Sequence, residues 1–118
     1  MAANPLPTAD LEFAIERTLE QITVYCTGKI TSDTAAQLKA TVKPLLSESH
    51  VVVLDLTHVD YMDSSGLGTI VGLYVSAKSA KSQLKVVNLN ERLKELFSIT
   101  RLGQMLSEGR DPDYLGMP

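Results

Sequence analysis

The chain has 118 residues, 44% of them apolar, and its 11 basic and 14 acidic residues give a net charge of −3 at pH 7. This length predicts one domain with a single hydrophobic core. The negative charge argues against a nucleic-acid-binding protein, and no apolar run approaches the roughly 18–20 residues of a membrane span. Cys26 is the one cysteine, so no internal disulfide can form, and we expect a cytoplasmic protein.

The first part of the chain predicts a leader followed by a hairpin. Residues 1–10 contain two prolines and are expected to be flexible. Residues 11–16 alternate apolar and polar side chains, which is typical of a half-buried strand. A second strand over residues 22–27 follows after a few residues, so we expect the two strands to pair antiparallel, with Gly28 closing the second.

A helix is predicted after this hairpin, because Thr31, Ser32 and Asp33 are favourable N-cap residues. Pro44 conflicts with the helical pattern, since proline removes a backbone donor and clashes with the preceding turn. We therefore expect a kink or a tightened helix end there. The apolar face of this helix consists of Ala35, Leu38, Val42, Leu45 and Leu46.

Residues 51–80 are the most informative stretch. A short apolar run rich in β-branched residues, 51–56, predicts a strand buried on both faces. Residues 62–65, Met-Asp-Ser-Ser, are predicted to cap a helix after a loop. Gly66 and Gly68 in its first turn cost about 1 kcal/mol each relative to alanine, and we interpret them as letting another group approach closely. The buried face recurs at intervals of three and four residues: Leu67, Ile70, Val71, Tyr74 and Ala77.

The last third predicts a strand over residues 84–88, then a short helix capped by Asn88 or Asn90. Residues 104–106 are a candidate last strand, and residues 107–118 are expected to form a tail. The buried face of the short helix is Leu89, Leu93, Leu96 and Phe97.

This order of elements, β-β-α-β-α-β-α-β, predicts an α/β domain. We expect a mixed central sheet of four or five strands, packed against three or four helices through right-handed crossovers. The two serines then follow the carboxyl end of a central strand, where ligands and partners commonly meet such sheets.

The run Val59-Asp60-Tyr61-Met62-Asp63-Ser64-Ser65-Gly66-Leu67-Gly68 resembles the signature of the STAS domain. It looks most like that of the bacterial anti-sigma factor antagonists. The resemblance covers about residues 11–106 and implies the STAS (SpoIIAA-like) fold. In those antagonists the anti-sigma factor phosphorylates the first serine of Asp-Ser-Ser-Gly-Leu-Gly, which is Ser64 here.

The resemblance also implies a function without catalysis. The chain is expected to bind an anti-sigma factor with serine-kinase activity and so release a sigma factor. Phosphorylation of Ser64 by that kinase is expected to end the interaction, and a phosphatase that acts on the phosphorylated form is expected to restore it. It implies no cofactor, metal, nucleic acid or membrane. Asp63 is expected to shape the loop, and Ser65 to cap the helix or stand beside the acceptor. The expected partner-binding residues are Asp63, Ser64, Ser65, Gly66, Gly68, Thr31 and Leu73.

Two positions depart from the antagonist pattern. The family usually has an acidic residue where Thr31 stands in this chain. The serine helix of the family often carries exposed basic and polar residues two turns after its start, where this chain has Gly72-Leu73-Tyr74-Val75. Leu73 and Val75, if exposed, would make the docking face more apolar, as an interface core tends to be.

Several other interpretations stay open at this level. The two serines can be helix caps alone, or the chain can be a STAS scaffold in a signalling or transport complex. Ser64 with His58 as base would make a small enzyme, although the flanking residues do not form a Gly-x-Ser-x-Gly elbow. The three aspartates Asp55, Asp60 and Asp63 match no calcium loop, and the chain has no Cys/His zinc set.

Overall fold

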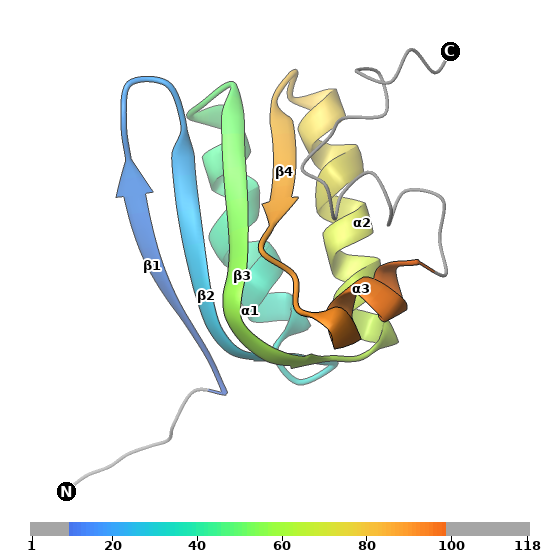
Figure 1. The fold of residues 1–118 in the computed structure, drawn as a ribbon. Coiled ribbons are helices and arrows are strands. Elements are labelled where there is room, and N and C mark those ends of the chain that lie inside the picture. Colours follow the sequence, from blue (N-terminus) through green and yellow to red (C-terminus); the bar gives the residue numbers. More distant parts are fainter. Residues whose placement is uncertain (1–9, 99–118) are drawn as a thin grey trace, which may run out of the picture.

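The computed structural model describes residues 10–98, which fold into a four-stranded sheet in the order β1-β2-β3-β4 (Figure 1). β1 pairs antiparallel with β2, whereas β2 with β3 and β3 with β4 are parallel, so the sheet is mixed as expected. The strands are β1 (Leu11–Arg17), β2 (Ile22–Ile30), β3 (Val51–Met62) and β4 (Gln83–Val87). The helices are α1 (Ala35–Val42), the 3-10 helix η1 (Lys43–Ser47), α2 (Ser64–Ser79) and α3 (Glu91–Phe97).

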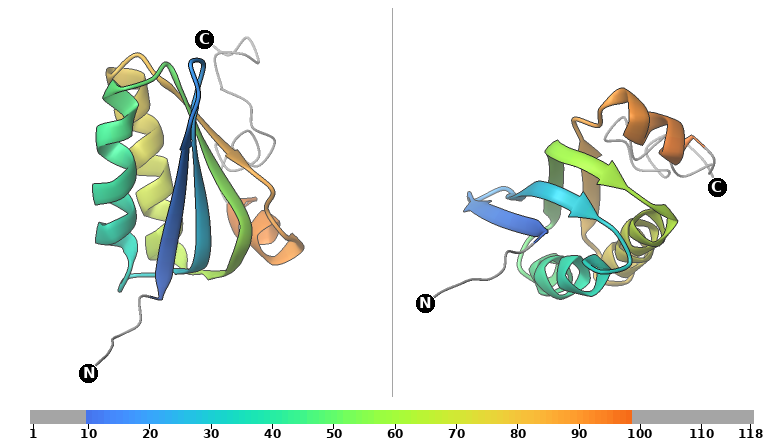
Figure 2. Two further views of the ribbon diagram at one scale, coloured as in Figure 1. Left: turned by 90° about the vertical axis from the view of Figure 1, so that its left-hand side faces the viewer. Right: turned by 90° about the horizontal axis from the view of Figure 1, so that it is seen from below.

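Two helices cover one face of the sheet. α1 and α2 lie next to each other on that face, and α3 lies on the other side of the sheet (Figure 2). The core fills the space between the sheet and these helices and is almost wholly aliphatic. Its largest fully buried side chains are Phe97, Leu11, Ile30, Leu38, Leu54, Leu56, Ile70, Leu73, Leu84, Leu93 and Val24.

The expectation that residues 51–56 are buried on both faces is wrong. Val52, Leu54 and Leu56 point to the helix layer and are fully buried, whereas Val51, Val53 and Asp55 are only half-buried. The physical reason is that both crossover helices lie on the same face, so the other face of β3 receives much less cover.

β3 is twice as long as predicted and contains two irregularities. It runs for 12 residues, and its pairing with β2 shifts register between Tyr25 and Thr27 and again between Gly28 and Lys29. At each shift β3 holds one more residue than β2, as in a β-bulge. The two extra residues fall where the burial pattern shows two exposed residues in succession, and this broken alternation is why the sequence indicated a loop after residue 56.

β2 also extends further than expected, to Ile30, so Gly28 does not close it. Gly28 adopts a φ of +121° at the second register shift, a conformation that favours glycine. A Cβ atom there would also overlap the carbonyl oxygen of Asp10. Glycine is therefore needed for the strand to pass this point.

The start and end of α1 differ in how well they were predicted. The tightened end at Pro44 is confirmed, because η1 is a 3-10 helix with proline in its first turn. The N-cap is Thr34 and not one of the three preceding residues, and it makes no side-chain cap bond. Its hydroxyl instead donates to the carbonyl of Lys29 at 2.9 Å and accepts from the amide of Thr31 at 2.9 Å. Thr34 is thus used to fold the β2–α1 turn.

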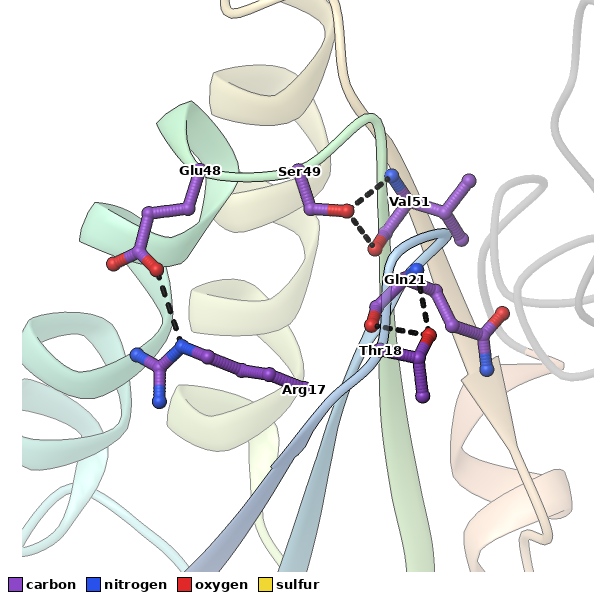
Figure 3. A network of polar contacts seen from close by, with 6 residues as sticks. All are labelled: Arg17, Thr18, Gln21, Glu48, Ser49 and Val51. Carbon is purple, nitrogen blue, oxygen red and sulfur yellow. Dashed lines mark hydrogen bonds and ion pairs between the residues drawn. The ribbon is translucent and has the colours of Figure 1, made fainter.

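Hydrogen bonds and an ion pair lie at the end of the sheet where the chain turns from β1 into β2 (Figure 3). Thr18 closes that turn, since its hydroxyl donates to the carbonyl of Gln21 and accepts from the amide of Gln21, both at 3.1 Å. Arg17 Nε lies 3.2 Å from Glu48 Oε1, but both side chains are about half exposed. Such an exposed pair contributes little, of the order of 0–1 kcal/mol. The hydrogen bonds of Thr18, and not the ion pair, therefore define the turn at this end of the sheet.

Three predicted segments fall wholly or mostly outside the described residues. These are the leader 1–10, of which only Asp10 is described, the candidate strand 104–106 and the tail 107–118. α3 is confirmed, with Asn90 as its N-cap: Asn90 Oδ1 accepts from the amide of Leu93 at 2.8 Å.

Candidate functional site

Ser64 is the first residue of α2 and is exposed. One residue, Asp63, separates it from the end of β3, so the expected loop before the helix is reduced to a single capping residue. Met62, the last residue of β3, still pairs with Ile30 of β2, and α2 begins two residues later, which fixes the direction in which α2 starts. Ser64 and Ser65 are consequently held on a rigid strand–helix junction.

Asp63 organises this junction through both carboxylate oxygens. Oδ1 accepts from the amide of Gly66 at 3.0 Å and so caps α2. Oδ2 accepts from the amide of Ser32 at 3.3 Å, and the amide of Asp63 donates to the carbonyl of Ile30 at 3.2 Å. The β2–α1 turn and the start of α2 are therefore joined into one surface, and the cap is Asp63, not Ser65.

Gly66 and Gly68 have different roles. A Cβ atom on Gly66 would lie 2.4 Å from the carbonyl oxygen of Ile30 and 2.9 Å from Cγ of Met62. The group that approaches Gly66 is thus the chain itself, which corrects its expected role in partner contact. Gly68 is exposed, and a Cβ atom there would meet nothing within 4 Å. Of the two, only Gly68 leaves room for another molecule.

Thr31 is half-buried in the β2–α1 turn, where its hydroxyl accepts from the amide of Asp33 at 3.2 Å. It borders a shallow hollow of about 640 Å³ between β2, β3 and α3. The charged residues of that hollow are Asp10, Lys29, Asp33, Asp60 and Arg92. Asp33, two residues after Thr31, is exposed and supplies a carboxylate close to the position that is acidic in the antagonist pattern.

Leu73 is 1% exposed and belongs to the core, so its expected place on the partner surface is corrected. The helical period explains this result, because Leu73 follows Ile70 by three residues on the same buried stripe. Val75 lies on the outer face of α2 with 57% of its surface exposed. Of this pair, Val75 is the apolar side chain that a partner can reach.

The geometry separates Ser64 from any histidine base. His58 lies in β3, where it pairs with Thr27, and four further strand residues follow it. At roughly 3.3 Å per strand residue the imidazole is more than about 10 Å along the strand from the serine. His50 precedes β3, at the opposite end of that strand. Neither histidine is within the hydrogen-bond reach that nucleophilic catalysis by Ser64 needs.

Two groups with shifted pKa values lie away from this junction. Burial raises the pKa of the Cys26 thiol to about 12. Burial acts to raise the pKa of Asp55 too, but hydrogen bonds from Thr57 and Asn88 outweigh it and lower that pKa. Neither group shares the surface with Ser64.

Within residues 10–98, no three His, Cys, Asp or Glu side chains are grouped so that they could hold a metal ion. None of the helices in that range has the length and apolar character to cross a membrane.

A model of the STAS domain family matches residues 12–111. The chain belongs to the STAS domain family. A curated STAS relative, the anti-sigma-B factor antagonist of Listeria monocytogenes, is 37% identical over 92 residues, which cover 77% of this chain and 81% of the relative. This places the chain among the anti-sigma factor antagonists of the family.

Two solved structures show the same STAS fold at low identity. An anti-sigma factor antagonist from Mycobacterium paratuberculosis is similar with a TM-score of 0.72 and 21% identity, covering 84% of this chain and 86% of that one. The Bacillus protein SpoIIAA in its phosphorylated form is similar with a TM-score of 0.63 and 19% identity, covering 79% and 86%. The expected fold class is therefore confirmed.

Sequence reasoning missed part of this STAS surface. It did not find that Ser32 joins the junction through its backbone amide, since a backbone contact between distant turns leaves no pattern in the sequence. It also missed the groove between α1 and α2 beside Ser65. The spacing of Ser65, Gly68, Gly72 and Ser76 on one side of the helix was the available signal.

Proposed function

We propose that this STAS domain is an anti-sigma factor antagonist switched by phosphorylation of Ser64. In its unmodified form it binds an anti-sigma factor in the cytoplasm and thereby releases a sigma factor. The anti-sigma factor, acting as a serine kinase, phosphorylates Ser64 and ends the interaction, and a phosphatase reverses the modification. The chain is a substrate and a binding partner in this scheme, not a catalyst.

The observation that carries the proposal is the exposed hydroxyl at the first residue of α2, fixed by the bonds of Asp63. A kinase needs an acceptor that it can reach without unfolding the substrate. Ser64 meets that need, because the strand end and the helix cap hold its backbone while the side chain stays exposed. Membership in the antagonist group supports the identity of the partner.

The chemistry needs only the hydroxyl from this chain. Ser64 Oγ attacks the γ-phosphorus of ATP held by the kinase, the bond between that phosphorus and the oxygen of ADP breaks, and the hydroxyl proton passes to a base of the kinase. The phosphate adds about −1.5 to −2 charges at pH 7. A helix N-terminus tolerates such charge, so the fold is retained.

The added charge acts on docking. Asp63 directly precedes Ser64 in the chain, so the phosphate adds its charge next to an existing carboxylate at the junction. Repulsion and bulk at that point oppose a partner that sits over the start of α2. The switch therefore requires no change of conformation in this chain.

The test is affinity purification of the tagged chain from its own cells, followed by mass spectrometry of the recovered proteins. We expect an anti-sigma factor, and the recombinant factor with ATP should place one phosphate on Ser64. Ser64→Ala should bind the factor as the unmodified chain does and accept no phosphate, whereas Ser65→Ala, the matched control, should still be phosphorylated. Recovery of a large assembly without any anti-sigma factor would instead support a scaffold.

A further inference from the structure

A groove of about 550 Å³ runs between α1 and α2, beginning beside the proposed acceptor. Its α2 wall consists of Ser65, Gly68, Gly72 and Ser76, and its α1 wall includes Ala35 and Lys39. From Ser65 to Ser76 the groove follows α2 for about 16 Å, at about 1.5 Å per residue. This length fits about three turns of another helix.

The two glycines of the groove are not required by the fold of residues 10–98. Both lie inside α2 and are exposed, and a Cβ atom on either would meet nothing within 4 Å. Glycine is unfavourable inside a helix compared with alanine. Small residues at a helix surface permit the short separations of 8–10 Å between the axes of packed helices. Their position therefore favours a close-packed occupant from outside the chain.

The charged side chains within α1, η1 and α2 are all basic. Residues 34–47 and 64–82 contain no Asp or Glu, although the chain has 14 acidic residues, and the acidic Asp33, Glu48 and Asp63 flank these two segments. These two segments contain four lysines: Lys39, Lys43, Lys78 and Lys81. Lys39 borders the groove, and the exposed Lys43, four residues further along the chain, lies with Lys39 on a neighbouring hollow of α1 and η1. A positive surface on a negative protein is complementary to an acidic ligand.

We propose that the groove between α1 and α2 is the docking site for an acidic helical segment of the anti-sigma factor. This inference rests on the proposed function and specifies the chemistry of its partner. The carboxylates of the segment face Lys39 and Lys43, and its small or apolar face packs on Gly68 and Gly72. A protein segment fits better than an anionic membrane, because membrane binding uses four to eight clustered basic residues and only Lys39 borders this groove.

The same arrangement explains how a phosphate on Ser64 could act. Ser65 forms the beginning of the groove, and Ser64 is its neighbour in the first turn of α2. A phosphate there places about two negative charges where the acidic segment enters. The repulsion opposes the attraction of Lys39 and Lys43, so unmodified and modified chains differ in affinity for the same segment.

The direct test is zero-length cross-linking of the purified complex between this chain and the anti-sigma factor that affinity purification is expected to recover. A carbodiimide joins a lysine amine to a carboxylate in contact with it. We expect cross-links from Lys39 or Lys43 to Asp or Glu residues spaced three or four apart on one partner segment. Cross-links confined to Lys29 or Lys85 would overturn the proposal, since these lysines lie in β2 and β4, outside the helix layer.

Charge reversal gives the second test. Lys39→Glu with Lys43→Glu should weaken binding to the anti-sigma factor by about tenfold or more and reduce its dependence on salt. Lys85→Glu, the control on the opposite face of the sheet, should change affinity by less than about twofold. An unchanged affinity of the double variant contradicts the groove. Failure of the wild-type chain to bind any anti-sigma factor contradicts the proposed function instead.

Substitutions that fill the groove test partner binding separately from folding stability. Gly72→Leu should fold at least as stably as the wild type, because its side chain enters open space, yet bind the anti-sigma factor about tenfold more weakly, as expected when an interface core is blocked. Gly72→Ala should weaken binding less than the leucine variant does, because a single methyl group fills less of the groove. Equal binding by the leucine variant would overturn the proposal. So would lysine-dependent binding of the chain to phosphatidylglycerol vesicles with no effect of Lys39→Glu on the protein complex.

Discussion

The carboxylate of Asp63 accepts a hydrogen bond from the backbone amide of Ser32 at 3.3 Å, although 31 residues separate the two in the chain. The other oxygen of the same carboxylate caps α2 at Gly66. One side chain thus holds the β2–α1 turn against the start of the helix that carries Ser64. The proposed acceptor is presented by this contact between two turns, and neither turn provides it alone.

Removing this carboxylate should loosen the junction. We expect Asp63→Ala to lower the free energy of unfolding by about 1–2 kcal/mol, as loss of a helix N-cap does, and to slow phosphorylation of Ser64. Asp63→Asn, which keeps a capping oxygen, should lose much less. Urea unfolding followed by circular dichroism measures the first effect. An alanine variant as stable as the asparagine variant would contradict the capping role.

Gly66 and Gly68 form a matched pair for testing how the turn packs on α2. Gly66→Ala should destabilise the domain by about 2 kcal/mol or more, because its Cβ atom would overlap the carbonyl of Ile30 and the backbone must move. Gly68→Ala should instead stabilise it by about 0.5–1 kcal/mol, since the new methyl group meets open space and alanine favours the helix. Denaturant midpoints for the two variants should therefore shift in opposite directions.

Phosphorylation of Ser64 should leave the fold intact. We expect the free energy of unfolding of the homogeneous phosphoprotein to be equal to, or about 0.3–1 kcal/mol above, that of the unmodified chain at low salt, because the helix N-terminus favours negative charge. Raising the salt to about 0.5 M should remove any gain. Thermal unfolding of both forms measures this. A marked loss of stability would show that the phosphate acts by unfolding the junction.

The buried thiol of Cys26 should make the free energy of unfolding depend on pH in the alkaline range. The folded state raises the pKa of the thiol to about 12, so it holds the proton more tightly than the unfolded chain. The stability linked to this proton is complete below the ordinary thiol pKa near 9 and is lost as the pH rises toward 12. Cys26→Ala should lose less stability over this window than the wild type. At neutral pH the native thiol should not react with a disulfide reagent until the protein unfolds.

Leu73 and Val75 test which side of α2 faces outward. Leu73→Ala should cost about 2–5 kcal/mol of stability, because it removes a fully buried side chain. Val75→Ala should change stability by less than about 0.5 kcal/mol, as an exposed substitution does. Chemical unfolding of the two variants distinguishes them. Similar losses for both would mean that α2 is rotated from the orientation described.

Local patterns predicted some elements well and others poorly. The faces of α2 and α3 follow the three- and four-residue spacing of their apolar residues, and Pro44 marked the tightened end of α1. The second half of β3 was not predicted, because two register shifts break its alternation. The predicted buried face of α2 included Val71 and left out Leu73, whereas in the structure Leu73 is buried and Val71 is only partly buried.

The sequence by itself determined the order of the elements, the capped start of α2 and the place of Ser64 there, because these depend on residues that are neighbours along the chain. Only the tertiary structure decided that Gly66 faces Ile30 and that Asp63 reaches Ser32. It also decided that α1 and α2 lie on one face of the sheet with a groove between them that Lys39 borders. Such relations depend on how distant segments pack, and packing is fixed by the fold as a whole, not by any single stretch of residues.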